Sequence, residues 1–332
     1  MAQMKYFYEL TISSSPHAHS PVTTQTIMRD VLIALSPAML GSIYFFGFRS
    51  LLVTLVSAAA CVFFEWGFCK IRKLHCKTYD LSAVVTGVLL AFVCPVTIPY
   101  WTIILGDFFA IVLVKMLFGG LGKNIVNPAL AGRAFLFSWP VLMSNWVKVG
   151  FDNAAGLLST ADTVTAATPM SAMHQGALPE ESILDMFLGN IGGCIGETSA
   201  LLLIIGFVYL LYRKVITARI PLAYIGTVAI LAFLFPQGND RIAWMAAQVF
   251  GGGLMLGAIF MATDYVTSPL TKLGQIVYGI GCGIITILIR YFGGYSEGVT
   301  YAILCMNACA VLLDKVGRPV KFGAPKKEAA KK

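Results

Sequence analysis

Long apolar stretches recur along nearly the whole chain, and they constrain its fold more than any other feature. A bilayer core about 30 Å thick is crossed by about 20 apolar residues in a helix. Only 12% of the 332 residues are charged and 58% are hydrophobic, too little polar material to cover a soluble globular surface. We therefore expect an all-α polytopic membrane protein with about ten transmembrane helices. The predicted spans lie near residues 29–47, 51–68, 81–94, 101–118, 127–143, 189–212, 219–235, 242–262, 273–292 and 299–313.

Several of these spans are interrupted by proline or glycine. The third ends at Cys94-Pro95, and the fifth opens on Asn127-Pro128. Residues 118–128 resemble residues 260–269, because each segment follows a long span and ends in a polar residue and a proline. With five spans before and five after a central polar segment, the pattern predicts two related halves with broken helices, resembling a transporter or channel-like fold.

The basic residues predict the orientation of the chain in the membrane. With the N-terminus in the cytoplasm, about 18 of the 24 Lys and Arg residues face the cytoplasm, a strong positive-inside bias. The net charge of +8 is therefore a topology signal, and nothing in its pattern resembles a nucleic-acid surface. We expect five regions: a polar cytoplasmic N-terminal tail (1–27), a first transmembrane half (28–143), an extracytoplasmic loop (144–184), a second transmembrane half (185–314) and a basic cytoplasmic tail (315–332).

The longest polar interruption contains Asp162-Thr163-Val164-Thr165-Ala166-Ala167-Thr168-Pro169. By composition alone, a stretch rich in Thr, Ala and Asp is a connector, and Asp162 or Thr165 is suited to cap a helix. Its position outside the predicted spans agrees with that interpretation. Composition by itself therefore leaves both a structural and a functional role open for this segment.

A few ionisable residues fall in or beside the predicted spans. Glu197 lies at an apolar helix start, where it either contacts a cation or another ligand, or complements the helix dipole. Arg133 is expected to pair with a carboxylate or a ligand rather than face lipid. Glu65, Asp107 and Asp264 are weaker candidates, because each is expected near the membrane boundary.

The eight cysteines do not form a Cys-x-x-Cys pair, and most lie in apolar runs. A thiol in such a run behaves as a small hydrophobic group. Cys94 and Cys194 are the one pair considered for an iron–sulfur or metal role, since each lies beside a predicted helix break. We predict no metal site.

Several motifs together carry a family resemblance. Asp162-x-x-Thr165-Ala166-Ala167-Thr168 resembles the flavinylation motif Asp-x-x-(Ser/Thr)-(Gly/Ala)-Ala-Thr. Further motifs lie at residues 13–17, 127–135, 189–199 and 261–265. Together they resemble the D subunit of Rnf complexes, which are ion-translocating ferredoxin:NAD oxidoreductases. The B subunit of the sodium-pumping NADH:quinone oxidoreductase is similar, but it usually carries a longer N-terminal extension, so the Rnf interpretation is favoured.

The resemblance implies that Thr168 carries FMN through a phosphoester bond made by a flavin transferase. Asp162, Thr165, Ala166 and Ala167 would complete the motif that the transferase recognises. Arg133 and Glu197 would lie near the flavin. The resemblance also allows a second, noncovalent flavin such as riboflavin.

The same resemblance implies one component of a redox-driven translocase of a bacterial or archaeal plasma membrane. No complete reaction, and no catalytic residue, is expected in this chain alone. Its implied partners in the Rnf complex are the flavoprotein G, the A and E membrane proteins, and the cytoplasmic B and C proteins. The coupled ion, sodium or a proton, stays open. The alternative from the sequence is a channel or carrier without redox activity, in which the Thr168 segment is an ordinary connector.

Overall fold

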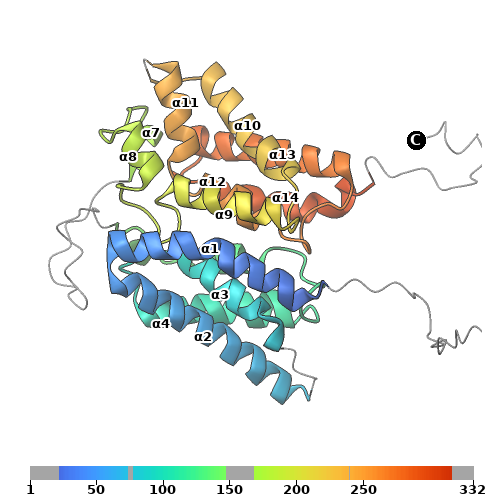
Figure 1. Cartoon of the computed structure of the whole chain (residues 1–332). Helices are drawn as coiled ribbons and strands as arrows, with labels where there is room; N and C mark the ends of the chain where they lie inside the picture. The colour runs from blue at the N-terminus through green and yellow to red at the C-terminus, as the bar shows by residue number, and fades with distance from the viewer. Residues whose placement is uncertain (1–21, 74–77, 147–167, 239, 316–332) are drawn as a thin grey trace, which may run out of the picture.

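The computed structural model describes residues 22–73, 78–146, 168–238 and 240–315, and all regular elements in these ranges are helical (Figure 1). The first elements are α1 (Thr24–Phe46), α2 (Phe48–Ile71), η1 (Thr78–Asp80), α3 (Ser82–Phe92), α4 (Tyr100–Phe108), the π-helical η2 (Phe109–Met116), α5 (Pro128–Leu136) and α6 (Pro140–Met143). The others are α7 (Pro169–His174), α8 (Ile183–Leu188), α9 (Ala200–Tyr212), α10 (Arg219–Leu234), α11 (Arg241–Phe250), α12 (Leu254–Leu256), the π-helical η4 (Gly257–Met261), α13 (Lys272–Phe292) and α14 (Val299–Leu313). The predicted all-α fold is confirmed for this part of the chain.

Three of these helices, α1, α2 and α13, are long and apolar enough to cross a membrane. A fourth span is formed if α11 and the α12–η4 pair, which meet at an angle of 59°, count as one broken helix. Shorter apolar helices are α3, α9, α10 and α14. Large apolar side chains such as Leu55 and Phe63 are exposed on α2, as expected of a surface that faces lipid. The chain is therefore a helical membrane protein, and the count of ten spans stays a prediction.

The helices form two groups that lie side by side. Figure 1 shows α1 to α4 in one group and α9 to α14 in the other. In the first group α2 packs against α3 and α4, and in the second α10 packs against α11 and α13. At the seam α1 and α9 run antiparallel, because Asp30 near the start of α1 accepts hydrogen bonds from Tyr209 (3.3 Å) and from Nε of Arg213 (3.2 Å) at the end of α9.

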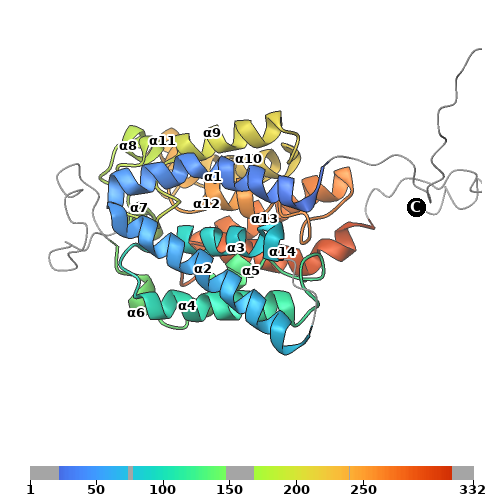
Figure 2. The same cartoon turned by 60° about the horizontal axis from the view of Figure 1, so that its bottom comes forward.

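The two ends of the molecule differ in which elements they carry. The start of α1, the end of α9 and the end of α14 lie at one end, whereas α7 and α8 lie at the opposite end (Figures 1 and 2). Asp314, just after α14, accepts a 2.7 Å hydrogen bond from the backbone N–H of Leu270, so α13 starts where α14 finishes. Thr168, which directly precedes α7, is therefore remote from the helix ends that lead to the two termini.

Non-helical backbone inside the helix groups is hydrogen-bonded. The segment 189–199 contacts the end of α3, where Ile195 N–H donates to the Cys94 carbonyl (3.0 Å) and Gly196 N–H donates to the Phe92 carbonyl (2.9 Å). The prediction that one helix starts at Gly189 and continues to Tyr212 is wrong, because α9 begins only at Ala200. Gly189 has φ +108°, which ends α8, and Ser199 caps the new helix.

The two similar segments noted in the sequence lie against one another. Residues 118–128 follow the π-helical η2, and residues 260–269 start within the last turn of the π-helical η4. Asn127 caps α5 through its side-chain oxygen, and its Nδ2 donates to the Met261 carbonyl (3.2 Å). The polar–proline pairs therefore contribute to contact between the two helix groups.

We expect Gly87→Ala to lower the free energy of unfolding by about 1–3 kcal/mol, because the added Cβ over-packs the α2–α3 contact. That Cβ would lie 2.7 Å from Cα of Ala58 and 2.8 Å from the Ser57 carbonyl oxygen. Thermal unfolding of the detergent-purified chain measures the effect. The matched control is Gly226→Ala in α10, where nothing lies within 4 Å and alanine favours the helix. Equal melting temperatures for Gly87→Ala and the wild type would contradict the prediction.

Candidate functional site

Thr168 is the one residue of the predicted flavinylation motif that the structure describes. Asp162, Thr165, Ala166 and Ala167 lie outside the described residues. Thr168 is the N-cap of α7: its backbone is extended (φ −75°, ψ 152°), and its Oγ1 accepts from Ser171 N–H at 3.3 Å. Ser171 Oγ in turn donates to the Thr168 carbonyl at 2.7 Å. The Thr168 side chain is therefore held in one position, with 9% of the residue exposed.

Helix α7 is anchored to the second group of helices. Met170 and Met173 are buried. A Cβ on Gly251 would lie 3.1 Å from Sδ of Met170, and one on Gly252 would lie 2.9 Å from its Cγ, so α7 packs on the break between α11 and α12. Nδ1 of His174 is 2.8 Å from the Arg290 carbonyl oxygen at the end of α13. Thr168 thus sits on a packed scaffold.

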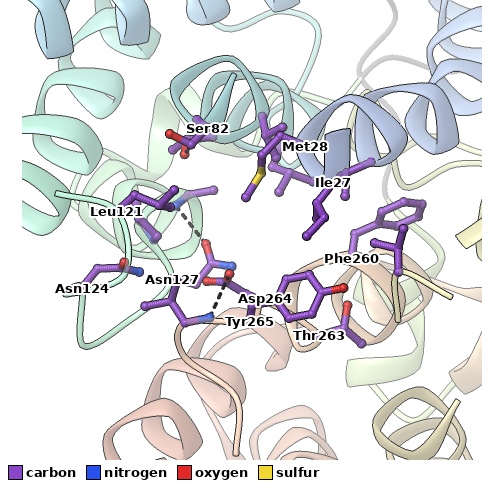
Figure 3. A pocket seen from close by; sticks show the side chains of 18 of the residues that line it. Ile27, Met28, Ser82, Leu121, Asn124, Asn127, Phe260, Thr263, Asp264 and Tyr265 are labelled. Carbon is purple, nitrogen blue, oxygen red and sulfur yellow. Dashed lines mark hydrogen bonds between the residues drawn. The ribbon is translucent and has the colours of Figure 1, made fainter. Parts of the chain in front are cut away.

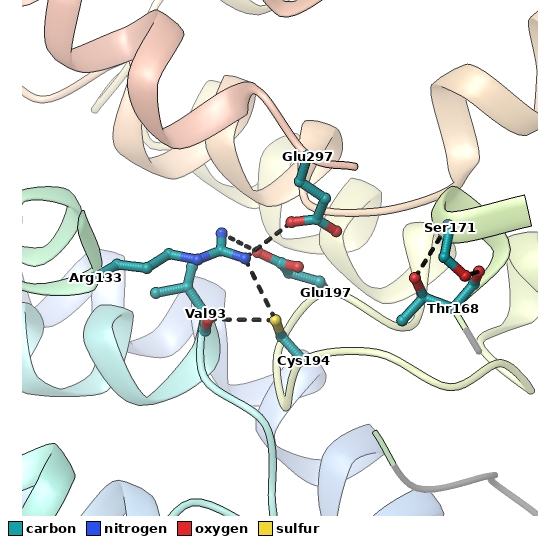
Figure 4. Close-up of polar contacts among 7 residues, drawn as sticks. All are labelled: Val93, Arg133, Thr168, Ser171, Cys194, Glu197 and Glu297. Atoms are coloured by element: carbon teal, nitrogen blue, oxygen red, sulfur yellow. Dashed lines mark hydrogen bonds and ion pairs between the residues drawn. The ribbon is translucent and has the colours of Figure 1, made fainter. Parts of the chain in front are cut away.

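Arg133 in α5 is the centre of a buried ionic cluster (Figure 4). Its Nη1 lies 3.0 Å from Oε1 of Glu197, and its Nη2 lies 2.8 Å from Oε2 of Glu297. Nη2 is also 3.6 Å from Sγ of Cys194, whose thiol donates to the Val93 carbonyl at 3.2 Å. The sequence predicts a carboxylate or a flavin beside Arg133, and the structure places two carboxylates there.

The cluster joins segments that are far apart in the chain. Glu197 comes from the extended segment before α9, and Glu297 from the connection between α13 and α14. Only 2% of the Arg133 side chain and 3% of the Glu197 side chain are exposed, against 17% for Glu297. A buried charge of this kind is costly unless it is paired. The cluster is therefore a cross-link between α5 and the second group of helices.

Glycines at the helix break bring this cluster next to α7. A Cβ on Gly252 would lie 2.8 Å from Oε1 of Glu297 as well as 2.9 Å from Cγ of Met170. A Cβ on Gly253 would overlap the Glu197 carboxylate. Figure 4 shows Thr168 beyond Cys194 and Glu197, on the chain that leads into α7. The predicted site residues Thr168, Arg133 and Glu197 therefore belong to one region of the fold.

Glu297 is a site residue that the sequence patterns did not single out. The sequence does contain a pattern that could have identified it, because Glu297 is the one carboxylate between the apolar runs of α13 and α14. Glu65 is buried and pairs with Lys115 at 3.2 Å, and its expected position near the membrane boundary stays a prediction. Asp264 lies between η4 and α13 and accepts from Val266 N–H and Thr267 Oγ1. Asp107 is fully buried in α4.

Cys94 and Cys194 lie near one another but differ from a metal site. Both thiols are buried and unoxidised, and Cys194 uses its hydrogen to bond the Val93 carbonyl. Within the described ranges, no three His, Cys, Asp or Glu side chains are grouped to hold a metal ion.

Broken apolar helices and a buried ionic cluster define the class: a polytopic helical membrane protein whose interior holds charged groups at helix breaks. The chain belongs to the NQR2, RnfD, RnfE family, whose model matches residues 11–323. Together with the D subunits to which the chain is similar, described next, this match confirms the resemblance to Rnf D subunits predicted from the motifs.

Three relatives are similar over nearly their whole length, and each is the D subunit of its complex. The one from the Na⁺-translocating ferredoxin:NAD⁺ oxidoreductase complex of Acetobacterium woodii is 46% identical over 323 residues, 96% of each chain. The one from the proton-translocating ferredoxin:NAD⁺ oxidoreductase complex of Clostridium ljungdahlii is 43% identical over 330 residues, covering 94% of this chain and 96% of the relative. The one from the ion-translocating oxidoreductase complex of Halorhodospira halophila is 36% identical over 342 residues, covering 93% and 94%.

We expect Arg133→Gln to lower the free energy of unfolding by about 3–5 kcal/mol, because it leaves the buried Glu197 carboxylate without its counter-charge. The double variant Arg133→Gln/Glu197→Gln should lose less than the sum of the two single variants. In all of these variants the Glu297 carboxylate is partly exposed, so water can solvate its charge. Thermal and denaturant unfolding of the purified chain measure both effects.

The matched control for this cycle is Arg213→Gln, which breaks a pair with Asp30 in which 45% of the arginine side chain is exposed. Its effect should be smaller than that of Arg133→Gln, because Asp30, although its side chain is only 7% exposed, keeps the hydrogen bond from Tyr209. Strictly additive effects at Arg133 and Glu197 would show that the two charges do not stabilise one another.

Proposed function

We propose that this chain is a redox subunit of an ion-translocating ferredoxin:NAD oxidoreductase, with FMN attached covalently to Thr168. The observation that carries the proposal is Thr168 itself, the last residue of the flavinylation motif, held as the N-cap of α7 beside the Arg133 cluster. The names of the relatives support the type of complex. The flavin would accept electrons from one partner and pass them to the next.

Unpartnered donors near α7 fit a phosphoester at this position. Nε and Nη2 of Arg290 are buried and have no hydrogen-bond partner within the described residues. Nη2 would lie 3.4 Å from a Cβ on Gly252, and Met170 packs against the same glycine. A phosphate offers acceptor oxygens for such a guanidinium. Arg290 would therefore bind the phosphate, while Arg133 would hold Glu197 and Glu297 in place around the flavin.

A flavin on Thr168 would face the extracytoplasmic side, with both termini in the cytoplasm. Support comes from the helix ends: α7 lies opposite the start of α1 and the end of α14 (Figures 1 and 2). Arg213 and Lys214, at the end of α9, lie with those termini, in agreement with the positive-inside rule.

We propose ten spans in two related halves, in which α1, α2 and α3 correspond to α9, α10 and α11. Support comes from the similar segments 118–128 and 260–269, which lie at the ends of the π-helical stretches η2 and η4.

The proposal requires partners, because one flavin cannot serve both faces of a bilayer about 30 Å thick. They would be the flavoprotein G, the A and E membrane proteins and the cytoplasmic B and C proteins of the complex, with a flavin transferase during maturation. The coupled ion of the complex is sodium or a proton. Similar relatives carry names with either ion, so the names favour neither.

We place a second, noncovalent flavin such as riboflavin at a cavity at the end opposite α7, which would have to open further to admit it, because its volume of about 80 Å³ is below the roughly 300–1,000 Å³ of small-molecule sites. Its walls come from α1, α3, α5 and the η4–α13 connection, and Figure 3 shows Asn124, Asn127 and Asp264 across from Ile27 and Met28. Apolar walls with a few convergent polar groups are typical of cofactor sites. Oδ1 of the buried Asn124 has no partner within the described residues, which leaves an acceptor for a ligand N–H or O–H group.

Two alternatives make different predictions. A B-type subunit of a sodium-pumping NADH:quinone oxidoreductase would also carry the covalent flavin, but would transfer electrons to quinone. A channel or carrier without redox activity would carry no flavin, and the isolated chain would transport a solute. The names of the relatives favour the ferredoxin:NAD complex.

Thr168→Ala is expected to abolish the covalent flavin, because the variant lacks the hydroxyl that forms the phosphoester. The chain is co-expressed with a flavin transferase, separated on a denaturing gel and read by in-gel fluorescence, and mass spectrometry is applied to the Thr168 peptide. The matched control is Ser171→Ala, which removes the nearest hydroxyl but leaves the acceptor. A fluorescent band in Thr168→Ala, or a dark band in the wild type, would refute the proposal.

Asn124→Ala is expected to lower the amount of noncovalent flavin that the folded chain releases on denaturation. The covalent fluorescence at Thr168 should stay unchanged, because the two sites lie at opposite ends of the molecule. Chromatography of the supernatant after acid precipitation measures the released flavin. Equal release from the variant and the wild type would place the second flavin elsewhere.

A further inference from the structure

Helix α2 has a buried polar face that runs along most of its length. Its members are spaced by three or four residues, and each is at most 5% exposed: Ser50, Thr54, Ser57, Cys61 and Glu65. Such spacing places them on one side of a helix. The opposite side carries exposed apolar residues such as Leu55 and Phe63. A membrane helix with this pattern turns exchangeable groups towards the protein interior.

Asp107 of α4 is the acid that faces the middle of this row. None of its surface is exposed. Its Oδ1 lies 2.7 Å from Oγ of Ser57 and 3.2 Å from Sγ of Cys61. Its Oδ2 is buried and has no hydrogen-bond partner within the described residues, and the same holds for Oγ1 of Thr102 on the same helix.

The contacts of Ser57 indicate where a proton lies. Its Oγ is 2.8 Å from the Gly87 carbonyl oxygen and 2.7 Å from Oδ1 of Asp107. A serine hydroxyl has a single hydrogen to donate. If that hydrogen goes to Gly87, the short contact with Asp107 is a hydrogen bond only when the carboxyl group supplies the proton. The close packing of Gly87 on Ser57 and Ala58 keeps the Gly87 carbonyl in place.

The charged groups around Asp107 do not provide it with a counter-ion. From α2 it faces Cys61 and, one turn further, Glu65; from η2 comes Lys115, which bonds Glu65 at 3.2 Å and Oγ of Ser82 at 2.7 Å. Helix α3 presents the Gly87 carbonyl, and Arg133 of α5 is already ion-paired with Glu197 and Glu297. An ionised carboxylate buried without a cation is costly.

We propose that Asp107 is a neutral carboxylic acid that binds and releases a proton on a path through the first group of helices. On its cavity side the path follows α2 from Cys61 to Glu65, and then Lys115 and Ser82, both of which line the cavity of Figure 3. On the other side it follows Ser57, Thr54 and Ser50 towards the end of the molecule that carries α7. One proton enters and one proton leaves the carboxyl group, and no electron is transferred.

The donor set around Asp107 suits a proton better than sodium. A hard cation requires several oxygen ligands. Beside Asp107 Oδ1 the structure offers one hydroxyl and one sulfur, and the carbonyl of Gly87 is reached through Ser57. This inference concerns the described residues of this chain and does not depend on the flavin at Thr168.

Infrared difference spectroscopy of the purified full chain tests the proposal. The wild type minus Asp107→Asn spectrum at neutral pH should contain the C=O band of a protonated carboxylic acid, shifted in ²H₂O. Ser57→Ala should move this band, because it removes a hydrogen bond to the acid. The control Asp185→Asn, at a partly exposed carboxylate that accepts a hydrogen bond from Ser182, should leave the band in place. Absence of the band from the wild type, its persistence in Asp107→Asn, or its loss on adding sodium would overturn the proposal.

Ion movement by the assembled complex in sealed vesicles tests the path. With ferredoxin and NAD as the redox pair, Asp107→Asn is expected to abolish proton movement while the flavin stays on Thr168, as seen by in-gel fluorescence. Unchanged proton movement would overturn the path. A missing flavin in the wild type would refute the proposed function and leave the infrared result valid, so the two failures can be told apart.

Discussion

A charged side chain inside an apolar helix group is costly unless it is paired, and two such pairs shape the interior of the protein. Arg133 is held between Glu197 and Glu297, and Lys115 between Glu65 and Ser82. In the first case the partners come from two connections in the second group of helices. The guanidinium therefore determines how α5, the segment before α9 and the start of α14 lie relative to one another. Removal of either partner leaves a buried charge, which costs more than the pair contributes.

The same logic applies to the backbone. Where a helix is interrupted in an apolar environment, its free N–H and C=O groups require new partners. The segment 189–199 supplies them to the end of α3, through Ile195 and Gly196. Gly196 has no room for a side chain, because a Cβ there would overlap the Phe92 ring. The glycine-rich, non-helical segment 189–199 is thus stable here because it forms hydrogen bonds with the end of α3. It also places Glu197 next to Arg133.

Three acids illustrate three ways of keeping a carboxyl group inside such a fold: Glu197 and Asp107 are buried, and Asp264 is partly exposed. Glu197 is paired with a guanidinium. Asp264 accepts from the backbone and the hydroxyl of its own turn. Asp107 has neither a cation nor a full set of donors, and a bound proton is the remaining way to remove its charge. The first two carboxyl groups have partners for their oxygens, whereas we propose that the third binds and releases a proton.

The sequence by itself determined the class, the family and most of the residues of interest. Low charge and repeated apolar runs predict a membrane protein because too few side chains remain to face water. The motif around Thr168 was recognised by its resemblance to a flavinylation motif, and Arg133 stood out because a charged residue within a predicted apolar span is costly. Only the tertiary structure showed that Arg133 has two carboxylate partners, that Glu297 belongs with Glu197, and that α9 begins at Ala200. Those facts depend on contacts between residues up to 164 positions apart, and local sequence patterns cannot encode such distances.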